Sequence, residues 1–160
     1  MSLLDDVSIV VTPNGYKAGE LYAVIPVPTE GAELVTNGDF ATDTDWIKSS
    51  QTTISNGSAN ILSTDGSFQF LQQNGYSSTQ GKKVSVTVNI TDVQSGQLKV
   101  SFAGGATNTN IPNTVGSHTI YVVNDGTVGV FSIGRVAGVT DITIDNVSVK
   151  EYTSADMDVT

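Results

Sequence analysis

The chain has 160 residues, of which 38% are hydrophobic and only 14% are charged, so it can build a core but offers few ion pairs. Its 16 acidic and 7 basic residues give a net charge of −9, which excludes nucleic acid and anionic membrane surfaces as expected partners. The absence of cysteine excludes disulfides, thiolate nucleophiles and cysteine-zinc sites, and no apolar run approaches the roughly 20 residues of a membrane span.

Short runs of β-branched residues, separated by Gly, Ser, Thr and Asn, predict an all-β protein. The first two runs, Asp5–Val11 and Leu21–Val27, flank Thr12–Gly15, whose proline and Asn-Gly pair favour a turn. We therefore expect an N-terminal β-hairpin, which needs its own domain or a neighbouring subunit to lie on because a lone hairpin is marginally stable. Pro26–Gly31 is typical of an extended linker, so residues 1–31 are predicted to form an arm and its linker.

From Ala32 onward, apolar and polar residues alternate with the period of two that is typical of half-buried strands. Residues 32–152 are therefore predicted to form a two-sheet antiparallel β-sandwich. The residues expected to face its core include Val84, Val86, Val88, Leu98, Val100, Ile142 and Ile144. His118–Val123 and Thr127–Ile133 flank Asn124-Asp125-Gly126, a sequence that favours a tight hairpin.

The last predicted strand changes parity in its middle. Ile142 and Ile144 would face one side of the sheet, whereas Val147 and Val149 would face the other. One extra residue at Asp145-Asn146 would return both pairs to the same face, so we expect a β-bulge there.

Several of these segments carry a family resemblance. They are the opening Leu34–Phe40 with Trp46, the following Ile54–Ile61, the middle segments Gln80–Val86 and Gly116–Tyr121, and the ending Asp141–Glu151. Together they resemble jelly-roll modules of the carbohydrate-binding class, which are often found on glycanases. The resemblance implies an antiparallel jelly roll over residues 32–152, but it does not fix a function, because one fold hosts many uses.

The N-terminal part resembles a different group of proteins. Leu3–Pro26 is similar to the N-terminal segment shared by tailed-phage virion structural proteins, and Thr153–Thr160 is similar to the link that joins one of their modules to the next. The resemblance implies an attachment arm, a displayed module and a C-terminal tail at 153–160. We therefore expect a phage virion structural protein, most simply a capsid (head) decoration protein or short head fibre.

The predicted arm is rich in apolar residues that the linker separates from the main core. Those expected to bind a partner are Leu3, Leu4, Val7, Ile9, Val10, Val11, Leu21, Tyr22, Val24 and Ile25. The expected partners are virion proteins, chiefly the major capsid protein, and further copies of this chain, with a trimer favoured. Because residues 1–6 lack the basic and apolar regions of a secretion signal, we expect assembly in the host cytoplasm and a final location in the virion.

The alternative function is that of a glycan-binding module or tail-fibre component that recognises host-surface carbohydrate. Sugar sites use exposed aromatic rings, because the C–H faces of sugars stack on them. Trp46 is expected in the core, and Phe68 and Phe70, which alternate with Gln69, are expected to face it as well. Tyr76 stands in a loop-like context and is the candidate glycan contact.

No cofactor is expected other than calcium, which the jelly-roll resemblance implies near Asp39 and Asp145. Ala41 stands where the family carries a further acidic ligand, which weakens the site, since calcium takes six or more oxygens. The favoured alternative is that Asp39 sets an Asx turn and Asp145 serves the bulge. Likewise, Asp43 and Asp45 are more simply explained as solvated turn residues than as a second metal patch.

Catalysis is not expected. His118 is the single histidine, and no Gly-x-Ser-x-Gly elbow marks a nucleophile for it to activate. A pair of carboxylates placed for glycoside hydrolysis is not indicated by any spacing. The sequence therefore predicts a structural or binding protein rather than an enzyme.

Overall fold

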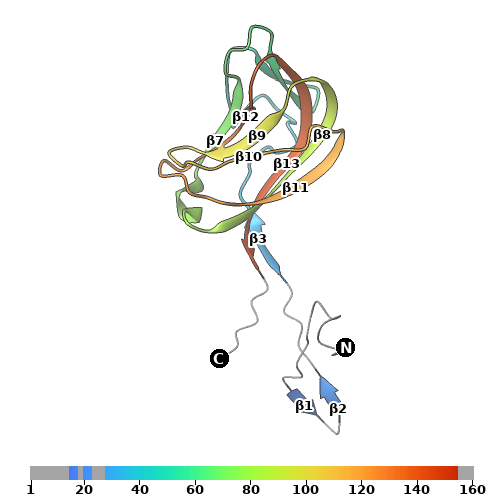
Figure 1. The fold of residues 1–160 in the computed structure, drawn as a ribbon, viewed down its shortest axis with the longest axis vertical. Coiled ribbons are helices and arrows are strands. Elements are labelled where there is room, and N and C mark those ends of the chain that lie inside the picture. Colours follow the sequence, from blue (N-terminus) through green and yellow to red (C-terminus); the bar gives the residue numbers. More distant parts are fainter. Residues whose placement is uncertain (1–14, 18–19, 23–27, 155–160) are drawn as a thin grey trace, which may run out of the picture. The chain divides into compact units, whose positions relative to one another are not determined.

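The computed structural model describes residues 15–17, 20–22 and 28–154, and Figure 1 draws their strands and turns as a ribbon. Among the described residues, Glu30–Thr153 form one compact unit, and strands β1 and β2 belong to a second one. No helix in these described ranges is long and apolar enough to cross a membrane.

The second unit contains a short antiparallel hairpin. Strand β1 (Gly15–Lys17) pairs with β2 (Glu20–Tyr22), with Gly15 opposite Tyr22. Gly15, which the sequence analysis expected in the turn, therefore lies in a strand, whereas Thr12–Asn14 lie outside the described residues. The predicted strand Asp5–Val11 lies outside the described residues.

The compact unit is built from strands joined by short turns. In chain order the elements are β3 (Thr29–Glu33), β4 (Ile47–Lys48), β5 (Thr52–Ser55), β6 (Ser58–Ser63), β7 (Phe70–Asn74), the 3-10 turn η2 (Tyr76–Thr79), β8 (Lys83–Ser95), β9 (Leu98–Phe102), β10 (Asn108–Asn110), β11 (Gly116–Val123), β12 (Val130–Arg135) and β13 (Thr140–Thr153). Thr29–Gly31, which the sequence assigned to the linker, therefore belong to a strand.

These strands form two sheets. One has five strands in the order β10-β9-β12-β7-β4. The other has six: five in the order β11-β8-β13-β6-β5, and β3, which pairs with β13 (Figure 1). The pairings along both orders are antiparallel. The prediction of an all-β antiparallel jelly-roll sandwich is confirmed.

The core lies between the two sheets. All seven residues that alternation assigned to it are buried, and so is Trp46, which is 7% exposed. The largest fully buried apolar side chains are Tyr76, Phe40, Phe131, Ile61, Leu71, Ile90, Leu98, Ile111, Ile133, Ile142 and Ile144. Both sheets thus place alternate side chains in one shared core, as a sandwich requires.

The predicted bulge in β13 is present. Asp145 lies opposite Asn89 and Ser148 opposite Thr87, so three steps along β13 match two along β8. Asn146 takes a φ of 48°, in the left-handed region that asparagine tolerates better than most residues. As a result Ile144 and Val147 both face the core.

The hairpin predicted around Asn124-Asp125-Gly126 was wrong. Strand β11 pairs with β8 in the six-stranded sheet, whereas β12 pairs with β7 and β9 in the other sheet. The buried Asn124 side chain donates to Tyr76 O at 3.0 Å and Thr79 Oγ1 at 2.7 Å, and its Oδ1 accepts the Gly126 N–H at 3.0 Å. This turn therefore passes the chain from one sheet to the other instead of pairing its flanking strands.

Replacing Val86 by Asp should unfold the sandwich. Val86 is 0% exposed, and a carboxylate there would be buried without a partner, which costs more than about 4 kcal/mol in typical cases. Thr53→Asp on the exposed side of β5 is the matched control and should melt close to wild type. Circular dichroism melts check this, and a folded Val86→Asp protein with unchanged melting temperature would contradict the face assignment.

Candidate functional site

The outer face of the five-stranded sheet carries a distinctive set of side chains. We call this surface the five-stranded face. Because Leu71, Val100 and Ile133 point into the core, the residues next to them in β7, β9 and β12 point outward. With the residues that the ladder register places beside them, they are Ile47, Phe70, Gln72, Asn74, Lys99, Ser101, Asn108, Asn110, Val130, Ser132 and Gly134.

Two rows of residues cross this face side by side. Directly opposite residues of antiparallel strands share a face, so the register defines each row. One row runs Ile47, Gln72, Ser132, Ser101, Asn108, and the other runs Phe70, Gly134, Lys99, Asn110. The first row offers the uncharged amide and hydroxyl groups of Gln72, Ser101 and Asn108, whereas Ser132 within it is buried, and the second row adds an aromatic ring and one cation.

Phe68, just before β7, completes the aromatic part of the face. Its side chain is 52% exposed, and its ring centroid lies 5.6 Å from that of Phe70 with 33° between the ring planes. The ring reaches over Gly134, where an added Cβ would lie 3.1 Å from Phe68 Cζ. Lys99 Nζ lies 5.9 Å from the centroid of the Phe68 ring. We call Phe68 and Phe70 the aromatic platform.

The platform corrects the expectation that Phe68 and Phe70 face the core. The residue between them, Gln69, is the buried one at 2% exposure. Its amide is fully engaged, because Nε2 donates to Ser67 Oγ at 2.8 Å and Oε1 accepts the Gln51 N–H at 3.0 Å. A satisfied glutamine can therefore occupy the interior, and the two phenylalanines turn outward.

The loop before Phe68 is fixed by a dense set of hydrogen bonds. The Arg135 guanidinium donates to the carbonyls of Gly66, Ser67 and, at 3.1 Å, Gly138. The Ser67 carbonyl also accepts from Ser63 Oγ at 2.8 Å. Asp65 Oδ1 accepts the Ser67 N–H at 2.9 Å, and hydrogen bonding by Ser67 lowers the pKa of that carboxyl. The platform is therefore held in place before any ligand arrives.

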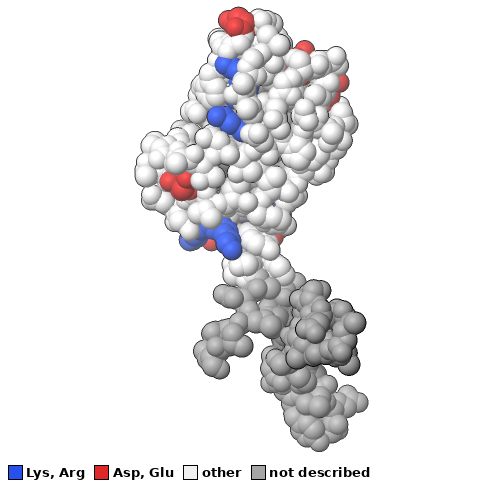
Figure 2. All heavy atoms as spheres, in the orientation of Figure 1, with Lys and Arg blue, Asp and Glu red and all other residues white. Residues whose placement is uncertain are grey.

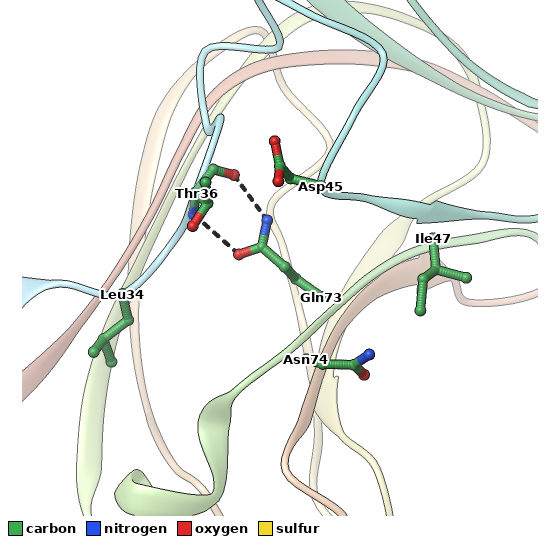
Figure 3. Close-up of a pocket in the computed structure, with 6 residues that line it drawn as sticks. All are labelled: Leu34, Thr36, Asp45, Ile47, Gln73 and Asn74. Carbon is green, nitrogen blue, oxygen red and sulfur yellow. Dashed lines mark hydrogen bonds between the residues drawn. The ribbon is translucent and has the colours of Figure 1, made fainter.

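A pocket of about 240 Å³ lies where β7 and β4 meet the segment after β3. It is lined by Leu34, Thr36, Asp45, Ile47, Gln73 and Asn74, as Figure 3 shows. Gln73 Oε1 accepts the Thr36 N–H at 3.0 Å, and Gln73 Nε2 donates to Thr36 O at 2.8 Å, so the pocket wall is rigid (Figure 3). Ile47 and Asn74 also belong to the five-stranded face, so the pocket adjoins that face at its β4 edge.

Tyr76, the predicted glycan contact, is buried at 1% exposure, so that prediction was wrong. The 3-10 turn directs its ring inward, 5.4 Å from the ring centroid of Phe131 and 6.0 Å from that of Phe102. Its hydroxyl donates to Gln73 Oε1 at 3.3 Å, and burial raises the pKa of that hydroxyl. The polar neighbours of Tyr76 in sequence suggested a loop tip, but the ring fills the core beneath β12.

The two aspartates of the expected calcium site are engaged locally. Asp39 Oδ1 accepts the Ala41 N–H at 3.3 Å, and Asp145 accepts both the N–H and the Nδ2 group of Asn146 at 2.7 Å each. Within residues 28–154, no three or more His, Cys, Asp or Glu side chains gather in a way that could hold a metal ion. Calcium binding at Asp39 and Asp145 stays a prediction.

The remaining candidates give no further site. His118 Nε2 lies 2.6 Å from the Thr114 carbonyl, Asp43 forms an ion pair with Lys48, and Asp45 accepts from Thr44 Oγ1 at 2.7 Å. The expected partner-binding residues of the arm lie outside the described residues or, for Leu21 and Tyr22 in β2, are described only as backbone. Their role in docking stays a prediction.

Comparison with known proteins adds information on the fold. No family model and no curated protein matches the sequence. The enzymatically active domain of tailspike protein 4 from bacteriophage CBA120 matches with a TM-score of 0.50 at 17% identity over 73% of this chain. A mutant of the carbohydrate-binding module CBM29-2 gives 0.47 at 15% identity, covering 84% of this chain and 98% of its own. A CBM4 structure gives 0.44 at 16% identity, covering 72% and 98%. This chain spans only 21% of the tailspike domain, so that likeness describes a fold and not a whole protein.

The pH dependence of stability should reveal the contribution of Asp65. The pKa of its carboxyl is lower in the folded than in the unfolded chain, so its stabilisation is present above about pH 4 and is lost as the pH falls through the folded value. Asp65→Asn should therefore lower the melting temperature at neutral pH and make its decline in acid shallower. Thermal melts from pH 7 to about pH 2 check this, and parallel profiles for the two proteins would contradict it.

Proposed function

We propose that the sandwich binds a glycan on its five-stranded face, as the carbohydrate-recognition part of a phage tail-type protein. The observation that carries this proposal is the pre-positioned platform of the exposed Phe68 and the half-buried Phe70, beside a row of uncharged amide and hydroxyl groups. The proposal assigns binding and no catalysis to this chain.

The chemistry of the face suits a sugar better than most other ligands. Sugar rings stack their C–H faces on aromatic side chains while their hydroxyls pair with amides and hydroxyls. Gln72, Ser101 and Asn108 lie in the row next to the platform. Gln72 and Ser101 are two strand spacings apart, roughly 10 Å, because β12 lies between them, and Asn108 is one spacing beyond Ser101. A saccharide lying across the strands would therefore meet apolar and polar groups together.

The scarcity of charge on the face favours a neutral glycan. Lys99 is the one charged side chain among its residues, and its amine lies near the Phe68 ring. Figure 2 shows that most of the sandwich surface on the side in view carries neither acidic nor basic side chains. The pocket beside Ile47 and Asn74 could take one polar group or ring at the end of such a chain, since it is smaller than the roughly 300 Å³ of typical small-ligand pockets.

The phage setting rests on two supports of different kinds. Leu3–Pro26 resembles the N-terminal segment of virion structural proteins, and the sandwich is similar in fold to a part of a phage tailspike domain. The second support favours a tail-type role over the capsid decoration expected from sequence. Nothing in the described residues specifically favours the capsid role.

Removing either ring of the platform should weaken glycan binding. Phe68→Ala and Phe70→Ala each delete one stacking surface, and a loss of about 1.4 kcal/mol corresponds to a tenfold weaker affinity. The matched control is Val128→Ala, which shortens an exposed apolar side chain (63% exposed) that belongs neither to the five-stranded face nor to β11. We expect glycan-array signals and calorimetric affinity for a neutral host-surface oligosaccharide to fall at least tenfold in the first two variants only.

The proposal would be wrong if the wild-type protein bound no neutral glycan, or if Val128→Ala lost binding while both phenylalanine variants kept it. Melting temperatures of all three variants separate a lost contact from a lost fold.

Gly134→Ala should weaken binding without removing any platform atom. The added Cβ would lie 3.1 Å from Phe68 Cζ and 3.2 Å from the Gln69 carbonyl, so the ring has to move. We expect a several-fold loss of affinity in the wild-type background and a smaller one in the Phe68→Ala background, where only the contact with the Gln69 carbonyl remains, because residues in contact couple. Equal losses in both backgrounds, measured by calorimetry, would show that Gly134 acts independently of Phe68.

A further inference from the structure

Strand β11 is an unusually long edge strand. All eight of its residues pair with β8, and no other strand in the described part of the chain pairs with it. The other sheet edges are formed by β5, β10 and β4, which have four, three and two residues. The free side of an eight-residue edge strand presents a row of unpaired N–H and C=O groups that can template pairing with another chain.

This edge carries none of the usual protection against such pairing. Proteins protect exposed edges with charged residues, prolines, bulges or short strands. The sequence of β11, GSHTIYVV, contains no acidic residue, lysine, arginine or proline, and its register with β8 is continuous from Gly116 to Val123. Its partner residues in β8 from Val84 to Ile90 are also uncharged. The result is an uncharged zone two strands wide in a chain of net charge −9.

Exposed apolar groups accompany the free edge. Tyr121 and Val123 on β11 are 59% and 43% exposed. The Tyr121 ring is fixed against Tyr152 of β13, with centroids 4.6 Å apart. A neighbour that pairs with β11 would therefore also find an apolar surface next to the edge.

We propose that β11 pairs antiparallel with β11 of a second copy of this chain, about a two-fold axis through the middle of the strand. Two copies that each carry a net charge of −9 repel one another least where no acidic side chains face each other, and this zone provides such a surface. The two-fold pairing lets the free backbone groups of each strand serve the other. It also places Tyr121 of each copy beside the Ser117–Thr119 stretch of its partner, where no like charges meet.

The contact is independent of the proposed glycan site, because β11 belongs to the six-stranded sheet and the platform to the other one. It gives a two-fold assembly, in contrast to the trimer expected from sequence. A further contact made by the arm would add to it without replacing it.

Placing lysines on the edge tests the proposal. In the double variant Ser117→Lys/Thr119→Lys, like charges would meet across the two-fold, whereas a monomer would leave both side chains in solvent. The matched control, Thr53→Lys/Ser55→Lys, adds the same charge to β5 at the opposite edge of the same sheet. We expect sedimentation equilibrium of the full chain, from micromolar to millimolar concentration, to show half the wild-type mass for the β11 variant and wild-type mass for the control. A monomeric wild type, or equal masses for all three proteins, would overturn the proposal.

A second measurement covers the case in which the β11 variant fails to fold. The chain has no cysteine, so Thr119→Cys introduces one attachment point for a spin label at an exposed position. Paired strands lie roughly 5 Å apart with about 3.3 Å per residue, so labels in the proposed dimer should lie within about 25 Å of each other. Electron spin resonance should detect that separation. Labels without a mutual distance in this range would exclude the two-fold contact.

Discussion

The antiparallel pairing of β13 with β8 is the contact on which the remainder of the sandwich depends. These are the two longest strands, with 14 and 13 residues, and β13 also pairs with β6 and β3. Its bulge at Asp145-Asn146 lets one strand present Ile142, Ile144, Val147 and Val149 to the same core. Without that extra residue, one of the two pairs of side chains would face solvent. Each side chain exposed in this way would cost about 1.5–3 kcal/mol of folding free energy.

The alternation of apolar and polar residues was sufficient to predict strands β8 and β13 of the six-stranded sheet, including the bulge, because each of these strands is apolar on one side only. It failed where a polar residue replaces an apolar one in the core. Gln69 is buried because its partners, Gln51 and Ser67, satisfy its amide, and Gln51 lies 18 residues away in the chain. Asn124 is buried through bonds to Tyr76 and Thr79, which are 48 and 45 residues distant. Such long-range hydrogen bonds leave no periodic signal, so the Tyr76 site and the hairpin after β11 were predicted incorrectly.

The candidate site depends on the burial of Gln69. With Gln69 in the interior, Phe68 and Phe70 must face outward, and Gly134 leaves room for the Phe68 ring to lie on the sheet. The bonds of Arg135 to Gly66 and Ser67 then fix the loop, so a ligand would not have to order it on binding. At the proposed site, Gln69, Arg135 and Gly134 would therefore affect affinity through the position of the Phe68 ring.

The two sheets of the sandwich divide the proposed roles between them. Sugar contacts of the kind offered by a single aromatic platform are individually weak, and linked sites gain affinity because the second binding event becomes intramolecular. Self-pairing through β11 would join two platforms in one particle while leaving both five-stranded faces uncovered, since the edge belongs to the other sheet. The uncharged edge would then act together with the platform. A fixed two-fold arrangement would raise the avidity of the dimer above the modest glycan affinity of each copy.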